Sequence, residues 1–161
     1  MAITLAPFAG IVWRILDARL AHDPCAAARA PEGRFHHSGQ RALYASLTAA
    51  GAGVAIARYV RENPGPRVIA PLHVDLARVR DLRAEPAPER ASVVWQELRA
   101  SGAPSPTWAL SDAARDLGTQ AMLYPSRSRP DLTHIVVFDW IAGLTVRPAG
   151  PARPWHPGPD G

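Results

Sequence analysis

An arginine, an aromatic residue and a serine stand at three separated points of the chain. Arg34 follows a glycine in a turn, Tyr44 lies on an alternating segment, and Ser126 ends another strand-like segment. A guanidinium binds phosphate oxygens through paired hydrogen bonds, an aromatic ring stacks on a base, and a hydroxyl donates to a phosphate or ribose oxygen. Together these residue types suit a pocket for a phosphate-bearing nucleotide.

The elements that must position these residues follow from apolar periodicity and from turn residues. Alternating or short apolar segments predict strands, and the expected strands are 11–16, 41–47, 67–76, 120–124, 134–140 and 144–147. Helices are expected at 24–29, 48–62, 90–100 and 108–117. Thr48 is the expected N-cap of the second helix, and Gly118 the residue that ends the last one. Pro71 predicts that 67–76 is an edge strand, because proline donates no ladder hydrogen bond.

Two features indicate where a cleft could form. Tyr44 and Ser46 lie two residues apart on the predicted strand 41–47 and therefore share one face of it. The connection before this strand, 17–40, is rich in Ala, Pro, Gly and His. A connection of this length within a compact domain is usually functional or mobile. We therefore expect it to flank the cleft.

The chain of 161 residues is long enough for one domain with its own core. Strands and helices alternate too irregularly for repeated βαβ units. This order predicts an α+β fold with a mixed, mostly antiparallel sheet flanked by helices. We assign 1–148 to this domain. Residues 149–161 are rich in Pro and Gly and are expected to form a disordered tail, although Trp155 could dock.

Charge and composition exclude several classes of function. The net charge is +4, all 18 basic residues are arginines, and they are scattered along the chain, so direct nucleic-acid binding is not expected. No apolar run reaches the length of a membrane span and the N-terminus lacks a secretory signal, which predicts a cytoplasmic protein. Cys25 is the single cysteine, so no disulfide is expected within the chain. No metal site is expected, because no third ligand stands at suitable spacing from His36 and His37.

Several motifs, taken in order, resemble the RES domain. The strongest are Gly33-Arg34-Phe35, the segment 42–47 and Leu123-Tyr124-Pro125-Ser126. Further support comes from Trp13-Arg14, 74–76, 81–82, 106–110 and 135–140. The similarity extends from about residue 11 to residue 148. Members of this family resemble ADP-ribosyltransferase toxins in fold and are typically toxins of bacterial toxin–antitoxin pairs.

The resemblance implies an activity, a substrate and a partner. It implies an enzyme that breaks down NAD by phosphorolysis or hydrolysis at the nicotinamide ribose. NAD would be the substrate and inorganic phosphate a co-substrate, with no resident cofactor. An Xre-like antitoxin protein would bind the enzyme and block its active site. Sequence alone leaves the oligomeric state open, and a homo-oligomer is one alternative.

The resemblance also assigns candidate site residues. We assign catalytic roles to Arg34, Tyr44 and Ser126, and substrate-binding roles to Arg14, Phe35, Ser46 and His36. Arg34 is expected on the NAD diphosphate and Tyr44 against the nicotinamide ring. Ser126 is expected to donate to a phosphate or ribose oxygen. Each of these residues also has a structural alternative, such as a surface arginine or a turn serine.

One residue departs from the family pattern. The family glutamate, which would stabilise the ribose cation, is expected at position 55, where this chain has alanine. Glu62 is the acid of this helix and lies roughly 10 Å further along its axis. Three alternatives follow: an active enzyme that recruits His36 or His37, an ADP-ribosyltransferase acting on a protein target, or an impaired member that binds a nucleotide or a partner.

Overall fold

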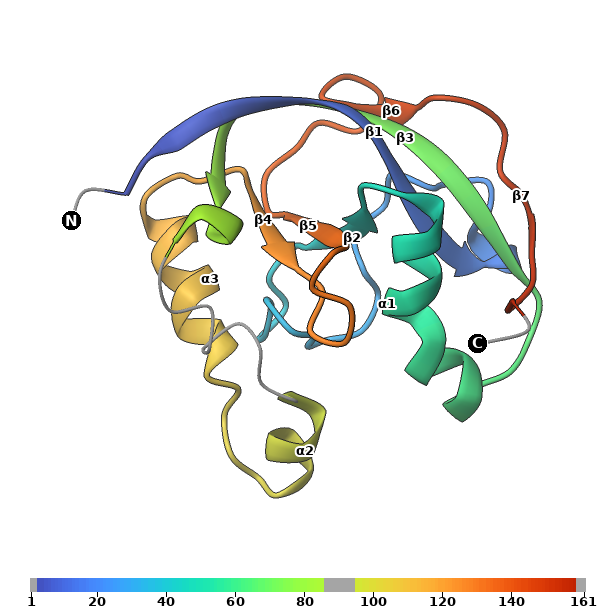
Figure 1. The fold of residues 1–161 in the computed structure, drawn as a ribbon, viewed down its shortest axis with the longest axis horizontal. Helices are drawn as coiled ribbons and strands as arrows, with labels where there is room; N and C mark the ends of the chain where they lie inside the picture. The colour runs from blue at the N-terminus through green and yellow to red at the C-terminus, as the bar shows by residue number, and fades with distance from the viewer. Residues whose placement is uncertain (1–2, 86–94, 159–161) are drawn as a thin grey trace.

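Two long, curved strands form an arch over the rest of the molecule (Figure 1). The computed structural model describes residues 3–85 and 95–158. Strands β1 (Leu5–Asp17) and β3 (Arg67–Asp81) pair antiparallel, with Leu5 opposite Arg80 at one end and Asp17 opposite Arg67 at the other. The two ends of β1 therefore lie on opposite sides of the molecule, with the shorter elements between them (Figure 1).

The shorter strands complete a seven-stranded sheet, in which six strands follow the order β1-β2-β5-β4-β3-β6 and the seventh, β7, also pairs with β3. They are β2 (Leu43–Ser46), β4 (Ala121–Pro125), β5 (Thr133–Val137), β6 (Val146–Pro148) and β7 (Arg153–Trp155). Because β1 also pairs with β3, the first five strands of this order close into a ring. All pairings between these described strands are antiparallel except β3 with β4. The α+β class with a mostly antiparallel sheet is confirmed.

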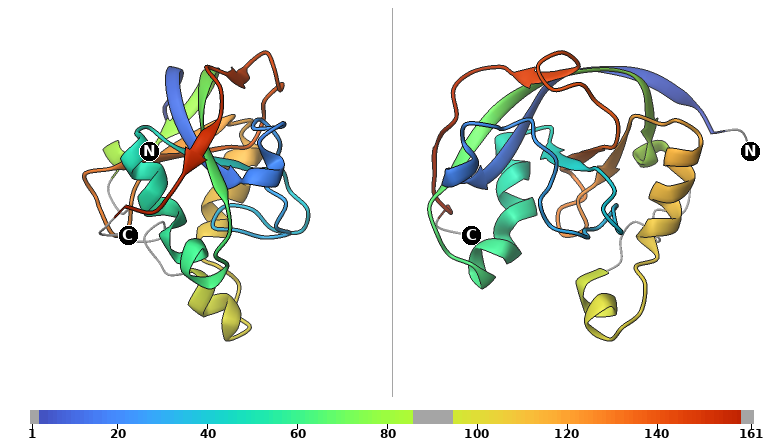
Figure 2. Two further views of the ribbon diagram at one scale, coloured as in Figure 1. Left: turned by 90° about the vertical axis from the view of Figure 1, so that its right-hand side faces the viewer. Right: turned by 180° about the vertical axis from the view of Figure 1, so that it is seen from behind.

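Helices flank the sheet on different sides, as the views in Figure 2 show. They are α1 (Ala49–Glu62), α2 (Trp95–Ala100) and α3 (Thr107–Asp116), with two short 3₁₀ helices, η1 (Ala18–Leu20) and η2 (Leu82–Ala84). Helix α1 packs beneath the arch against β1, β2 and β5. Within the described part of the chain, no helix combines the length and the apolar character that crossing a bilayer requires.

The central strands β4 and β5 are buried on both faces. Ala121 and Leu123 of β4 pack into one apolar cluster beneath the arch, whereas Met122 and Tyr124 pack into a second cluster with α3. Alternation along a strand sends neighbouring side chains to opposite faces. A strand covered on both sides therefore has an almost continuous apolar sequence, as β4 has.

Most expected elements are present, but β1 begins six residues before the expected strand 11–16 and β3 ends five residues after the expected strand 67–76. Thr48 caps α1 by accepting a hydrogen bond from the Gly51 N–H at 2.9 Å. Gly118 follows α3 with a φ of +70°, a conformation that favours glycine. The strand expected at 134–140 ends at Val137, and the part of the expected helix 90–100 before Trp95 lies outside the described residues.

The prediction that 67–76 is an edge strand is wrong. Strand β3 pairs with β1 on one side and with β6 and β7 on the other. Pro71 falls in the gap between β6 and β7, where the Ala149 N–H donates to the Pro71 carbonyl at 2.9 Å. Proline is tolerated in this interior strand because position 71 lies outside the ladders of both β6 and β7, so neither pairing depends on its missing N–H.

The helix expected at 24–29 is also absent, and these residues form turns and extended chain. Their carbonyl groups are bound by a distant side chain, since Arg14 Nη1 donates to Pro24 O and Ala26 O. Tertiary contacts override a weak local helix preference here. In the predicted tail 149–161, residues 153–155 form β7, which pairs with β3 from Arg67 to Ile69.

Candidate functional site

A cavity of about 420 Å³ opens beneath the arch, between β1, α1, the turn 33–36 and the turn after β4. This volume lies within the range of about 300–1,000 Å³ that is typical of small-molecule sites. The predicted site residues that line it are Arg14, Arg34, His36, Tyr44, Ser46 and Ser126. The tertiary structure thus brings together residues from four distant segments.

The turn that carries Arg34 is held by backbone and side-chain bonds on both sides. The Gly33 N–H donates to the His36 carbonyl at 2.9 Å. From the start of α3, Trp108 Nε1 donates to the Gly33 carbonyl at 2.8 Å, and the Thr107 hydroxyl donates to the Arg34 carbonyl. The sequence Gly33-Arg34-Phe35 therefore forms a rigid turn that fixes where the arginine side chain leaves the backbone.

Tyr44 and His36 complete this turn with a chain of hydrogen bonds. The Phe35 N–H donates to the Tyr44 hydroxyl at 2.9 Å, and this hydroxyl lies 2.8 Å from His36 Nδ1. His36 Nε2 lies 2.9 Å from the Ala30 carbonyl, so Nε2 carries the proton and Nδ1 accepts from the tyrosine. Burial lowers the pKa of His36 and raises the pKa of Tyr44, which keeps both groups neutral.

Glycine is required at position 33 by close packing. A Cβ at Gly33 would lie 2.5 Å from His36 Cε1 and 3.0 Å from the Tyr44 hydroxyl. No ordinary side chain fits this space without moving the imidazole or the phenol. The glycine of the motif thus permits the contact between the turn and Tyr44.

Arg34 lies in the cavity without a charged partner among the described residues. Its Nε and Nη2 atoms are buried and make no hydrogen bond in the described part of the chain. The guanidinium carbon lies 5.0 Å from the centre of the Tyr124 ring and 5.3 Å from that of Phe35. Burial lowers the pKa of Arg34, yet arginine remains charged at neutral pH. Donors of a buried cation left in this state are suited to an anionic ligand.

Arg14 lines the same cavity from β1 but has protein partners. Its Nη1 donates to Pro24 O at 2.7 Å and to Ala26 O at 2.6 Å. Burial lowers the pKa of Arg14 to about 10, so it too is charged at neutral pH. Arg14 thereby holds the connection 17–40 against the cavity wall, while its side chain adds positive charge to the cavity.

Ser46 and His134 form a pair at the base of the cavity. They face each other across β2 and β5, with Ser46 Oγ 2.7 Å from His134 Nδ1. Ser46 is fully buried and His134 is 5% exposed. Burial, followed by the charge of Arg34, lowers the pKa of His134 to about 4, so the imidazole is neutral at neutral pH.

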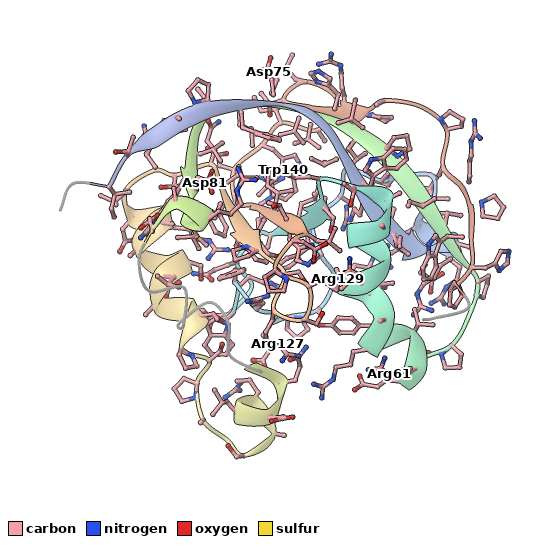
Figure 3. The ribbon with its side chains drawn as sticks, in the orientation of Figure 1. Arg61, Asp75, Asp81, Arg127, Arg129 and Trp140 are labelled. Carbon is pink, nitrogen blue, oxygen red and sulfur yellow. The ribbon has the colours of Figure 1, made fainter. Side chains whose placement is uncertain are left out.

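Ser126 begins the turn between β4 and β5. Its Oγ accepts from the Arg129 N–H at 3.2 Å, and its own N–H donates to the Leu132 carbonyl at 2.9 Å. The hydroxyl proton of Ser126 is bound by no acceptor within the described residues and can turn toward a ligand. Arg127, the second residue of this turn, appears in Figure 3 in the region between α1 and α2, and it also lines the cavity.

The charge of the lining is net positive, although the Arg58 charge is compensated by Glu62. Its arginines are Arg14, Arg34, Arg58 and Arg127. Glu32 is the carboxylate among the described lining residues, and it forms an ion pair with Arg99 at 3.0 Å. Ala55 is exposed at the wall formed by α1, whereas Glu62 pairs with Arg58 and does not line the cavity. An anion is therefore the ligand that this cavity favours.

No metal-binding group is formed by the described residues, since no three His, Cys, Asp or Glu side chains lie close enough together to share an ion.

His37, an alternative recruit for the missing glutamate, does not line the cavity. Its Nε2 lies 2.9 Å from Asp112 Oδ2 and so connects the loop to α3. The polar side chains that line the cavity include arginines, hydroxyls, imidazoles and the carboxylate of Glu32.

The structure places Phe35 in the core rather than at the cavity. Phe35 is fully buried and packs edge to face on Tyr124, with 4.8 Å between ring centres. The Phe35 ring makes a cation–π contact with the Arg34 guanidinium. An aromatic residue that directly follows a cavity-facing arginine in a tight turn points the other way, which gives Phe35 a supporting position.

Several residues that line the cavity were not among the site residues expected from the sequence. They are Glu32, Arg58, Tyr59, Tyr124, Arg127 and His134. Tyr124 stood within a quoted motif, but its side chain could not be directed to the cavity without knowing which face of β4 is inside. His134 is found only through its pairing opposite Ser46 and Tyr124. No local pattern around a single histidine signals such a pairing.

Comparisons with known proteins agree with this architecture. The RES domain family matches residues 11–156 of the chain. Among solved structures, a chain from the crystal structure of the M. tuberculosis MbcT–MbcA toxin–antitoxin complex is similar, with a TM-score of 0.65 and 16% sequence identity. The similarity covers 95% of this chain and 87% of that chain. At this identity it establishes a shared fold. Comparison with curated protein sequences gives no match.

Proposed function

The chain belongs to the RES domain family, and from that premise we propose that it breaks down NAD at the nicotinamide ribose as the toxin of a toxin–antitoxin pair. The bond that breaks joins C1′ of this ribose to the nicotinamide nitrogen. Nicotinamide leaves with the bonding electron pair. An oxygen of water or of inorganic phosphate then bonds to C1′, and the attacking group gives up a proton when it is water.

The observation that carries this proposal is the unpartnered guanidinium of Arg34. Its Nε and Nη2 are buried beside the cavity and bind no described residue. A charged donor pair in this state costs stability unless a ligand binds it. A diphosphate offers oxygens at the spacing of a guanidinium edge and compensates the charge.

The rest of the lining supports a dinucleotide. Arg127, an exposed residue of the lining, extends the positive field toward solvent and favours the approach of an anion. The Tyr44 ring lines the wall and can stack on nicotinamide, while its hydroxyl is bound within the turn. Ser126 offers its free hydroxyl proton to a phosphate or ribose oxygen. Catalysis in such a site comes from orientation and fixed charges.

Incubation of the purified protein with NAD and inorganic phosphate tests the reaction directly. We expect release of free nicotinamide, measured by chromatography, and a loss of kcat/KM of about 100-fold or more in Arg34→Ala. Arg129→Ala is the matched control, because Arg129 is exposed, pairs with Asp131 and does not line the cavity. Equal inactivity of wild type and Arg34→Ala at high enzyme concentration contradicts the proposed catalysis.

Labelled NAD distinguishes the possible acceptors. Label recovered as ADP-ribose indicates water, and label recovered as a phosphorylated ADP-ribose indicates inorganic phosphate. Label attached to protein indicates ADP-ribosyl transfer to a target, which is the alternative that the same cavity would serve. Each product requires cleavage of the same glycosidic bond, so the role of Arg34 is tested in all three cases.

The toxin role predicts a partner that covers the cavity. The solved structure with a similar chain is a toxin–antitoxin complex, and an Xre-like antitoxin is the partner that the family suggests. Induced expression of the wild-type chain is expected to stop bacterial growth and to deplete cellular NAD. Arg34→Ala is expected to remove both effects at equal protein level. Growth arrest that persists in Arg34→Ala without NAD depletion contradicts this role.

A second candidate is a family member that binds the nucleotide but turns it over poorly. The observation that favours it is Ala55, which lines the cavity where a carboxylate would stabilise the ribose cation. Ala55→Glu tests it, because the exposed position accepts a longer side chain. A gain in kcat of about 100-fold or more supports impaired catalysis in the wild type. Robust wild-type turnover that Ala55→Glu leaves unchanged contradicts it.

A further inference from the structure

His134 is a buried residue of the cavity lining. It lies on β5 and is paired directly with Ser46 on β2 and with Tyr124 on β4. The three residues share one face of the sheet, and all of them line the cavity. The centre of the Tyr124 ring lies 5.6 Å from that of His134 and 5.0 Å from the Arg34 guanidinium carbon. His134 and Arg34 thus both contact the same ring, and the charge of Arg34 acts on His134.

The hydrogen bond with Ser46 determines which imidazole nitrogen carries the proton. Ser46 is fully buried, and His134 Nδ1 is the acceptor within reach of its hydroxyl proton among the described residues. A buried hydroxyl proton without an acceptor is costly, so the hydroxyl donates to Nδ1. The neutral imidazole then carries its proton on Nε2, which makes no hydrogen bond with any described residue.

We propose that the His134 Nε2–H, oriented by Ser46, is a second hydrogen-bond donor to the phosphoryl group that Arg34 binds. This inference rests on the proposed function for the identity of the ligand as NAD. The phosphoryl oxygen belongs either to the diphosphate of the dinucleotide or to inorganic phosphate as the attacking group. The two sources share their chemistry, and separate binding measurements distinguish them.

A neutral donor has an advantage at this position. A second buried cation beside Arg34 would add repulsion in the empty cavity, which a neutral imidazole avoids. The imidazole donates without charge before the ligand enters, and a bound phosphate favours its protonation. Ser46 acts as a positioning residue, because without its hydroxyl the imidazole can rotate and exchange its tautomers.

Two substitutions separate a ligand contact from a purely structural role. His134→Gln keeps an amide near the Nε2 position and loses the contact with Ser46, whereas His134→Asn keeps a polar group near Nδ1 and loses the donor at Nε2. We expect His134→Asn to weaken binding about tenfold, the value of one buried hydrogen bond, and His134→Gln to bind more tightly than His134→Asn. A structural role predicts the opposite order.

Calorimetric titrations with ADP-ribose and with inorganic phosphate provide the measurement. A loss confined to ADP-ribose places Nε2 at the diphosphate, and a loss confined to inorganic phosphate places it at the attacking group. Affinities of His134→Asn equal to or higher than those of His134→Gln overturn the proposal, as does failure of both probes to bind the wild type. His73→Asn is the control, because His73 is a half-buried strand histidine outside the cavity.

Nitrogen NMR of the imidazole gives a readout that is independent of activity. At pH 7 we expect the ¹⁵N shifts of His134 to show a neutral ring protonated at Nε2, and those of Ser46→Ala to show mixed tautomers. A charged ring or a proton on Nδ1 overturns the proposal. The release of nicotinamide by the wild type tests the proposed function separately. A chain that binds ADP-ribose in the expected order but releases no nicotinamide retains the His134 contact and loses only the reaction.

Discussion

Two arginines enter the same cavity from different walls, and their surroundings are opposite. Arg14, from β1, donates to two carbonyl groups of the connection that follows its strand. Arg34, from the turn 33–36, leaves Nε and Nη2 without a partner among the described residues. Both side chains are largely buried and both keep their charge at neutral pH. Arg14 therefore stabilises the fold through its hydrogen bonds, whereas the guanidinium of Arg34 remains available to bind a ligand.

This difference shows that two largely buried cations in one site can have different roles, depending on whether they have protein acceptors. A buried cation with protein acceptors stabilises the folded state, and a buried cation without them lowers stability until a ligand binds. The turn that carries Arg34 supports this arrangement, because its own polar groups are bound by Tyr44, Thr107 and Trp108. The rigid surroundings keep the guanidinium in place without neutralising it.

The largest expected effect compares the two arginines directly. Arg14→Met leaves the Pro24 and Ala26 carbonyls without their donor, at a cost of about 2 kcal/mol each and thus about 4 kcal/mol in the free energy of unfolding. Arg34→Met removes a buried cation that has no described partner and should raise this free energy, by about 1 kcal/mol or more, in the absence of ligand. Urea unfolding of both variants provides the measurement. Equal losses would remove the distinction between the two walls.

His134 sharpens the comparison through pH, because one of its nitrogens is bound and the other is free. Its pKa in the folded state, about 4, lies below the ordinary value of 6.5. The unfolded chain therefore binds the proton more readily, and stability falls as the pH is lowered from 6.5 to 4, by up to about 3 kcal/mol. His134→Gln lacks this contribution. We therefore expect the free energy of unfolding of the wild type, relative to that of the variant, to be lower at pH 4 than at pH 7. A relative value that does not change with pH contradicts the shift.

Gly33→Ala tests whether the rigid turn is needed to present Arg34. The added methyl group meets the His36 ring at 2.5 Å and should cost about 2 kcal/mol through displacement of the imidazole. Binding of ADP-ribose should weaken as well, because the turn moves with it. Gly53→Ala is the control, since its Cβ has an ordinary contact at 3.6 Å and should raise helix stability by about 1 kcal/mol. Similar effects of both changes would show that the turn has no special role.

The smallest expected effect concerns the Tyr44 hydroxyl. Tyr44→Phe removes the hydroxyl that accepts from the Phe35 N–H and donates to His36 Nδ1, and it should cost about 1 kcal/mol of stability. Because the hydroxyl is bound within the turn, kcat/KM should fall by less than about tenfold. Tyr59→Phe, on the exposed side of the cavity, is the control. A loss of about 1,000-fold in Tyr44→Phe would show instead that this hydroxyl takes part in the reaction.

Sequence patterns were informative where the physical cause is local. The α+β class, the N-cap at Thr48 and the positive φ of Gly118 follow from periodicity and from the conformational preferences of single residues. The motif around Arg34 indicated the family, and the family domain covers nearly the whole chain. These inferences need no knowledge of which segments meet in space.

Inference failed where distant contacts decide. The segment 24–29 has a local preference for helix, but the guanidinium of Arg14 binds its carbonyl groups instead. Pro71 indicated an edge strand, and only the gap between β6 and β7 explains why it lies inside the sheet. In both cases a partner from another part of the chain supplies or releases a hydrogen bond, which no local pattern records.

The sequence by itself determined that an arginine, a tyrosine and a serine are available in the order of the family, since residue types and their spacing are local facts. The tertiary structure alone decided which of their polar atoms remain open. The Tyr44 hydroxyl is bound by the turn, the Phe35 ring lies in the core, and Arg34 keeps free donors. The pairing of β2 with β5 added His134, because hydrogen-bond partners across strands are set by register and not by neighbours along the chain.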